Sequence, residues 1–367
     1  MNENPLLRLS SFGQSVWLDY IHRSLMQSGG LLRLIEEDGL RGITSNPTIF
    51  DQAIEGSDVY DETIRGLARE GKKAPEIFEA LATEDVGRAA DILRPVHDTL
   101  QGRDGFVSIE VNPHLARDDK ATVEEARRLW KTLSRPNVMI KVPATLEGLK
   151  AIRRLIGEGI NVNVTLLFGL PRYRMVADAY IAGLEDRVAK RLPIAGISSV
   201  ASFFLSRIDA MLDPLLEKNG VADARMLRGR IAVSSARLAY RMFKEIFGSE
   251  RFRKLAGLGA APQRLLWAST GSKDPAYSDI KYVEALIGDQ TVNTLPMQTL
   301  EAYRNHGDPR PRIEEDMDRA QMSLARLSDF GIEIDTVTRE LEEEGIEKFN
   351  KPYDSLMANI QKKSGGL

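Results

Sequence analysis

Short apolar runs rich in β-branched residues recur along this chain and alternate with longer stretches in which apolar residues have helical spacing. Each short run has the length and composition of a buried strand. The eight runs span residues 16–21, 41–45, 106–111, 138–142, 160–167, 197–203, 264–269 and 291–295. Strands that alternate with helices predict βαβ units, which build a parallel sheet.

Eight βα units in succession favour an α/β fold of the (β/α)8 TIM barrel type. The alternative is an open, doubly wound sheet. Such a sheet normally carries a glycine-rich phosphate loop after an early strand, and the sequence has none. We therefore expect residues 1–367 to form a single (β/α)8-barrel domain with extra helices.

Two segments exceed what a minimal barrel requires. The first, near residues 51–103, is charged and helix-prone, and its stretch 75–93 predicts a helix with proline in the first turn. The second, near residues 312–367, is a helical extension with acidic runs of the kind found on solvated helix faces. We expect the second segment to pack on the barrel, and both segments are candidates for a subunit interface in a homo-oligomer.

Composition excludes several classes of function. The chain has no cysteine, which rules out a thiol nucleophile, a disulfide or a thiolate metal site, and no histidine pair has metal-ligand spacing. A formal net charge of −3 provides no field that would favour nucleic acid or an anionic membrane. No apolar run approaches the ~18 residues needed to span a bilayer, and no signal peptide is recognisable. We expect a cytoplasmic protein without a metal site.

Lys141 is the most unusual residue in the predicted strands. It lies within the run Val-Met-Ile-Lys-Val-Pro at 138–143, which predicts a buried strand that ends at Pro143. Lysine is rarely buried unless it is paired or used. Burial favours the neutral amine, which attacks carbonyl groups and forms Schiff bases. The alternative is an edge-strand lysine whose ammonium reaches solvent. Lys141 is thus a candidate nucleophile toward carbonyl compounds.

Polar residues also stand at the ends of the other predicted strands. In a (β/α)8 barrel the carboxyl ends of the strands meet at one rim, where catalytic groups gather. Any one of these residues could merely satisfy local backbone groups. Together they supply a carboxylate pair, amides and an arginine, which Schiff-base aldol chemistry on a sugar phosphate requires in addition to an amine. The residues are Asp19, Asn46, Glu110, Asn163, Thr165, Ser202, Arg207 and Ser269.

Five motifs in order give the chain a family likeness. They occupy residues 42–50 (Gly-Ile-Thr-Ser-Asn-Pro-Thr-Ile-Phe), 107–111, 137–145, 159–168 and 202–209. With them the chain resembles the transaldolases, in the longer form found in actinobacteria and cyanobacteria. The resemblance implies transfer of a dihydroxyacetone unit from sedoheptulose 7-phosphate to glyceraldehyde 3-phosphate, giving erythrose 4-phosphate and fructose 6-phosphate. This reaction belongs to the non-oxidative pentose phosphate pathway and needs no cofactor.

The resemblance also implies a role for each candidate residue. Lys141 would form the Schiff base, Glu110 and a water held by Thr165 would transfer protons, and Asp19 would be the acid/base of carbon–carbon cleavage. Asn46 and Asn163 would hold the dihydroxyacetone hydroxyls, and Ser202 and Arg207 would bind the phosphate. The alternative for Arg207 is a structural salt bridge to Asp209 or to another nearby acid.

One departure from the family concerns the phosphate site. Many shorter transaldolases place a second phosphate-binding arginine after the seventh strand, where this chain has Ala-Ser-Thr-Gly-Ser-Lys at 268–273. Lys273 could supply that charge, although without the bidentate geometry of a guanidinium. Ser269 and Lys273 are therefore candidate substrate contacts, and the alternative for Lys273 is an exposed loop lysine.

Two other functions compete with the transferase hypothesis. A Schiff-base aldolase that releases free dihydroxyacetone would share the barrel and the lysine. In the family Glu110 favours the transferase, whereas glutamine or tyrosine near that position would favour the aldolase. A non-catalytic sugar-phosphate sensor would retain Arg207 but would not need Lys141, Glu110 and Asp19 together.

Overall fold

Eight parallel strands close into a barrel in which each strand pairs with its sequence neighbours and β8 pairs with β1. The computed structural model describes residues 4–365. Each predicted strand overlaps an observed one, so the (β/α)8 barrel is confirmed and the open sheet is wrong. The strands are β1 Gln14–Asp19, β2 Gly42–Thr44, β3 Phe106–Glu110, β4 Val138–Pro143, β5 Val162–Leu167, β6 Ser199–Phe204, β7 Arg264–Ala268 and β8 Thr291–Leu295.

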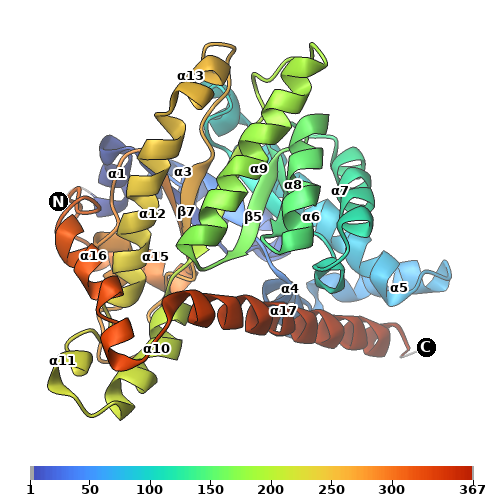
Figure 1. Ribbon diagram of the computed structural model, residues 1–367. Helices are drawn as coiled ribbons and strands as arrows, with labels where there is room; N and C mark the ends of the chain where they lie inside the picture. The colour runs from blue at the N-terminus through green and yellow to red at the C-terminus, as the bar shows by residue number, and fades with distance from the viewer. Residues whose placement is uncertain (1–3, 366–367) are drawn as a thin grey trace.

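Helices surround the barrel and connect its strands (Figure 1). Within residues 4–365, none of them combines the length and apolar character needed to cross a lipid bilayer. The α-helices are α1 Pro5–Leu9, α2 Arg23–Gln27, α3 Gly30–Asp38, α4 Pro47–Glu55, α5 Asp61–Arg69, α6 Ala74–Thr99, α7 Asp119–Leu133, α8 Leu146–Glu158, α9 Leu170–Ala189, α10 Ser206–Lys218, α11 Ala222–Arg225, α12 Ile231–Phe247, α13 Glu250–Ala256, α14 Lys281–Glu284, α15 Met297–His306, α16 Met317–Ala325 and α17 Ile334–Ser364. Short 3-10 helices span Ser10–Phe12, Asp58–Tyr60, Pro113–Leu115 and Ser328–Phe330.

The segment that follows β4 shows how the sequence sets these elements. β4 ends at Pro143, and the hydroxyl of Thr145 accepts a hydrogen bond from the backbone N–H of Gly148 at 2.9 Å. This cap satisfies one of the free amides at the start of α8. Ile152 and Leu155 are fully buried on the face that packs against the barrel. The capped and half-buried helix α8 therefore fixes the end of the strand that carries Lys141.

The insertion contains α6, which begins as predicted and continues further. Proline stands in its first turn, but the helix runs through Pro95 to Thr99 instead of ending near residue 93. An internal proline removes one helical hydrogen bond and disfavours the turn before it. Here Leu93 is fully buried and Val96 packs on the core, so tertiary packing outweighs that local cost.

The last helix, α17, crosses the barrel. Figure 1 shows it in dark red along the face where the strands end and where α4, α9 and α10 begin. Its buried face includes Leu341, Gly345 and Phe349, one turn apart, and continues to Leu356 and Ile360. The extension therefore lies over the rim on which the candidate catalytic residues were predicted.

Ion pairs and hydrogen bonds hold α17 at both ends. Near its start, Arg172 of α9 pairs with Glu342 at 3.1 Å, with side chains only 17% and 13% exposed. Near its end, Lys363 pairs with Asp61 at 2.7 Å. Glu342 thus departs from the expectation that this acidic run is fully solvated, because it meets an arginine of the barrel.

Candidate active site

Lys141 is buried inside the barrel between two other predicted site residues. In the strand register it lies opposite Glu110 of β3 and Asn163 of β5, so the three residues occupy one level of the sheet. Only 5% of Lys141 is exposed. The predicted burial is confirmed, and the edge-strand alternative, in which the ammonium reaches solvent, is wrong.

The Lys141 amine has two close neighbours. Its Nζ donates a hydrogen bond to the backbone carbonyl of Ser45 at 2.8 Å and lies 3.9 Å from Oε2 of Glu110. The Ser45 hydroxyl in turn donates to the carbonyl of Ser108 at 2.9 Å, which fixes the loop after β2. A carbonyl acceptor orients the amine without adding a charge to it.

Glu110 is a carboxyl poised near neutral pH. Burial raises its pKa to about 7, with the Lys141 charge opposing the rise, Asp19 adding to it and Arg207 opposing it. Its Oε2 is buried and has no hydrogen-bond partner among the described residues. A group that titrates near pH 7 exchanges protons in both directions, as an acid/base catalyst must.

Asp19 ends β1 on the other side of the rim. Burial raises its pKa, and the charge of Lys141, a hydrogen bond from Thr44 and the charge of Lys273 act in the opposite direction. The Thr44 hydroxyl is 2.6 Å from Oδ1 of Asp19 and 2.8 Å from the Thr294 hydroxyl. The two carboxyls thus both influence the amine but have different partners, which suits separate roles in proton transfer.

Asn163 and Ser202 are bonded to each other. The Ser202 hydroxyl donates to Oδ1 of Asn163 at 2.6 Å, and Nδ2 of Asn163 donates to the Ser108 hydroxyl at 3.0 Å. This chain of bonds fixes the amide beside Lys141. The hydroxyl of Thr165, two residues further along β5, is buried and has no partner among the described residues. It is therefore free to hold a water or a substrate atom.

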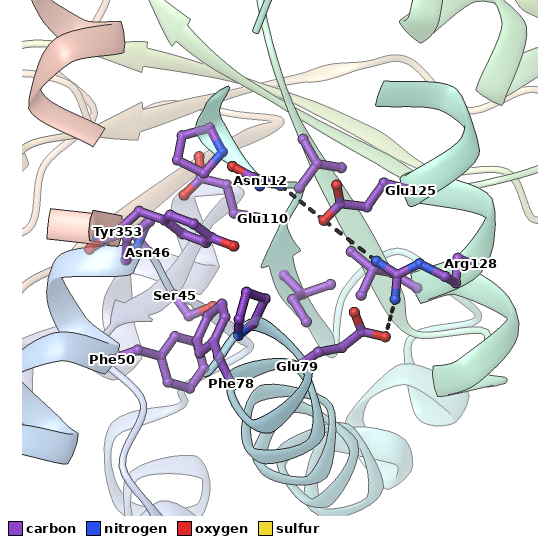
Figure 2. Close-up of a pocket in the computed structure, with 16 residues that line it drawn as sticks. Ser45, Asn46, Phe50, Phe78, Glu79, Glu110, Asn112, Glu125, Arg128 and Tyr353 are labelled. Atoms are coloured by element: carbon purple, nitrogen blue, oxygen red, sulfur yellow. Dashed lines mark hydrogen bonds and ion pairs between the residues drawn. The ribbon is translucent and has the colours of Figure 1, made fainter. Parts of the chain in front are cut away.

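Asn46 stands where β2 meets α4. Its Oδ1 accepts a hydrogen bond from the backbone N–H of Ile49 at 3.0 Å, so it caps the helix. Asn46 and Glu110 also line a cavity of about 140 Å³. Figure 2 shows this cavity, which Phe78 and Tyr353 also line. The cap fixes the amide at the rim, at the place expected for a substrate contact.

Arg207 is the second residue of α10, and its guanidinium lies close to two aromatic rings. The carbon Cζ is 5.6 Å from the ring centre of Phe204 and 5.7 Å from that of Phe349. Nη1 is buried without a hydrogen-bond partner among the described residues. Burial lowers the pKa of Arg207, with Glu344 and Glu110 opposing. A desolvated cation with a free edge is a ready site for an anion.

The salt-bridge alternative for Arg207 does not hold. Asp209 instead accepts hydrogen bonds from Lys281 Nζ at 2.7 Å and from the Tyr282 hydroxyl at 2.8 Å. Both of these partners are on or beside α14, so Asp209 ties α10 to that helix. Asp209 is therefore not the ion-pair partner of Arg207.

The loop after β7 approaches the same place. The Ser269 hydroxyl lies 2.8 Å from that of Ser206, the first residue of α10, and the Ser269 carbonyl accepts the Ser206 N–H at 3.1 Å. Ser269 adopts a φ of 55°, which is strained for a residue with a side chain. Because the Lys273 charge acts on Asp19, its ammonium lies within electrostatic reach of the rim. Whether it binds phosphate stays a prediction.

Sequence reasoning missed three residues that organise this site. Ser108 precedes Glu110 by two positions on the same strand face, and that alternation could have revealed it. Thr44 lies in a strand so short that no alternation is legible. Phe349 is far along the chain, and no local pattern connects it with Arg207.

No resident metal is suggested by the side chains. Within residues 4–365, no group of three or more histidine or acidic residues is placed to hold a metal ion.

Comparison with known proteins adds an independent line of argument. The sequence profile of the family described as Transaldolase/Fructose-6-phosphate aldolase matches residues 16–360. "Transaldolase 2" of Nostoc punctiforme is 45% identical over 99% of this chain and 98% of its own length. "Transaldolase 1" of Streptomyces coelicolor is 48% identical over 97% and 94%, and "Transaldolase" of Thiobacillus denitrificans is 45% identical over 96% and 98%.

Proposed function

The chain belongs to the transaldolase and fructose-6-phosphate aldolase family, and from this premise we propose that the side chains around Lys141 form its catalytic centre. Its activity is that of a transaldolase of the pentose phosphate pathway, which acts on sugar phosphates. The observation that carries the residue assignment is a buried amine 3.9 Å from a carboxyl whose pKa is about 7.

The proposed donor is sedoheptulose 7-phosphate. Lys141 Nζ attacks its carbonyl carbon, giving a carbinolamine that loses water to form a Schiff base. Glu110 supplies the proton that leaves with the water, assisted by a water molecule held by Thr165. Asn46 and Asn163 hold the hydroxyls of the dihydroxyacetone part, so that the reacting carbon stays above the amine.

Carbon–carbon cleavage follows from the same geometry. Asp19 accepts the proton of the hydroxyl next to the scissile bond, the bond electrons move into the Schiff base, and erythrose 4-phosphate leaves as an aldehyde. The remaining enamine attacks the aldehyde of glyceraldehyde 3-phosphate, and Asp19 returns its proton to the new hydroxyl. Hydrolysis of the second Schiff base then releases fructose 6-phosphate and restores the Lys141 amine.

Borohydride trapping tests this assignment. The wild-type protein, incubated with fructose 6-phosphate and reduced, is expected to carry a dihydroxyacetone adduct on Lys141 in peptide mass mapping. Adding erythrose 4-phosphate before reduction should remove most of the adduct, because the acceptor takes the unit. An adduct on another lysine would contradict the assignment. Accumulation of free dihydroxyacetone without an acceptor would favour the aldolase over the transferase.

Arg207→Ala is expected to raise the KM for fructose 6-phosphate about 10- to 100-fold, the effect of losing a charge-assisted hydrogen bond to phosphate. Trapping of unphosphorylated dihydroxyacetone on Lys141 should continue, since that ligand has no phosphate. Steady-state kinetics and the trapping assay measure the two effects. The matched control is Arg326→Ala, because Arg326 also packs on an aromatic ring, that of Phe330, but pairs with Asp223. An unchanged KM in Arg207→Ala would place the phosphate elsewhere.

Lys273→Gln is expected to raise the same KM by a smaller factor, about threefold, and the effect should shrink as salt is added. A lysine acts on phosphate as a point charge that solvent and ions screen. The measurement is KM for fructose 6-phosphate at low and high ionic strength. A KM equal to that of the wild type at low salt would identify Lys273 as an ordinary loop lysine.

A further inference from the structure

The guanidinium of Arg207 is contacted by a part of the chain outside the (β/α)8 repeat. One of its two aromatic neighbours, Phe204, ends β6, but the other, Phe349, belongs to α17. The two rings meet edge to face, with 6.5 Å between their centres and an interplanar angle of 74°. Phe349 is only 7% exposed, so its ring is packed against the protein.

The position of Phe349 is set by close packing one helical turn earlier. A Cβ atom on Gly345 would come within 2.9 Å of Leu166 Cδ2, so a larger residue here would have to displace the end of that leucine side chain. Leu166 itself has a φ of 54° at the point where the β5–β6 register shifts. This irregularity of β5 directs the leucine to the helix. This packing of α17 on β5 therefore helps to fix the position of the Phe349 ring.

The contact with the two rings matters because Nη1 of Arg207 has no hydrogen-bond acceptor among the described residues. Arginine has a long, flexible side chain, and fixing it in one geometry costs conformational freedom. Most buried arginines are held by an acceptor, but Nη1 of Arg207 has none among the described residues. Contact with aromatic rings orients the plane of a guanidinium while leaving its N–H edge available. That edge is what a phosphate group accepts in bidentate fashion.

We propose that Phe349 is a positioning residue for the phosphate of the substrate, which it serves by holding the Arg207 guanidinium against Phe204 with its N–H edge free. The inference rests on the proposed phosphate role of Arg207. It makes α17 part of the proposed site, since this helix supplies one of the two rings that the guanidinium contacts.

The test compares Phe349→Leu, which removes the ring, with Phe349→Tyr, which keeps it. Phe349→Leu is expected to raise both the KM for fructose 6-phosphate and the inhibition constant of inorganic phosphate about fivefold, the loss expected from one desolvated cation–π contact. kcat and the trapping of unphosphorylated dihydroxyacetone on Lys141 should stay close to wild type. Phe349→Tyr should recover most of the phosphate affinity. Phe330→Leu is the control, because it removes the ring that contacts the Arg326 guanidinium, a cation–π contact outside the proposed phosphate site.

The double variant separates this inference from the function on which it rests. In an Arg207→Ala background, Phe349→Leu should cause no further rise in KM, because the cation that the ring positions is gone. If Arg207→Ala raises KM but Phe349→Leu does not, the positioning role is wrong and the phosphate site stands. If neither raises KM, the phosphate site itself is wrong. Equal losses in Phe349→Leu and Phe349→Tyr would also overturn the role, since they would indicate a displaced helix.

Discussion

Replacing Lys141 with alanine is expected to lower kcat/KM by about 10⁴-fold or more while the fold survives, in line with the loss of other catalytic nucleophiles. Every covalent step of the proposed reaction passes through this amine, and no other group can form the Schiff base. The measurement is transaldolase turnover together with borohydride trapping and a thermal unfolding curve. Lys141→Arg provides a second variant that keeps the charge but cannot form the imine, and it should be equally inactive.

A matched control is available on the next helix. Lys150 is exposed on α8, shortly after β4, and Lys150→Ala should retain wild-type activity. Activity near wild type in Lys141→Ala would remove the Schiff-base assignment. Loss of the cooperative unfolding transition in that variant would assign the residue a structural role, and Lys141→Arg would then be the decisive test of chemistry.

Glu110→Gln is expected to reduce kcat by about 10²- to 10³-fold with little change in KM, because general acid–base catalysis typically contributes this much. The amide keeps the shape of the side chain but cannot exchange a proton. Single-turnover kinetics should show slower formation and hydrolysis of the Schiff base. Exposed Glu340→Gln is the control. An effect confined to KM would indicate that Glu110 binds substrate without transferring protons.

The same variant has an opposite effect on stability. Burial raises the pKa of Glu110 from 4.5 to about 7, so between these pH values the folded protein holds a proton that the unfolded chain has lost. Unfolding then releases protons, and the contribution of this group to stability falls as the pH rises through that window. Glu110→Gln should therefore have a higher Tm than wild type above pH 7, with the difference disappearing below about pH 4.5. An equal Tm at pH 8 would mean that ionising this carboxyl costs the fold nothing.

The rim could be located from the sequence because closure of the barrel brings the carboxyl ends of the strands together at one end. Residues that end successive strands, such as Asp19, Glu110 and Asn163, are distant along the chain but meet when the strands close. The bounds of the strands were predicted only to within two residues. β1 begins at Gln14, two residues earlier than predicted, because the Gln14 amide is buried and donates to the Leu286 carbonyl at 2.8 Å. A polar residue satisfied in this way has no signature in a hydrophobic pattern.

The contacts of α17 with the barrel could not have been predicted from the sequence. Charge patterning indicated solvated acidic faces on helices that pack on the barrel, but nothing local distinguishes Phe349 from any other phenylalanine on an apolar stripe. Its role depends on the irregular backbone at Leu166 and on the space that Gly345 leaves, both of which are tertiary features. Periodicity can thus identify a helix and its buried face, but it does not say which partner that face meets.

Because α17 is the last helix in sequence order, it is synthesised after every other part of the proposed site. Lys141, the two carboxyls and Arg207 leave the ribosome first, followed by β8, whose pairing with β1 closes the barrel. Phe349 emerges only after all of these, because α17 spans Ile334–Ser364. In the proposed assignment, the amine that forms the Schiff base is therefore synthesised before the ring that orients Arg207 toward phosphate. In a nascent chain, the proposed reactive lysine would be present before the residues proposed to select phosphorylated substrates are complete, and the last helix would supply the missing ring.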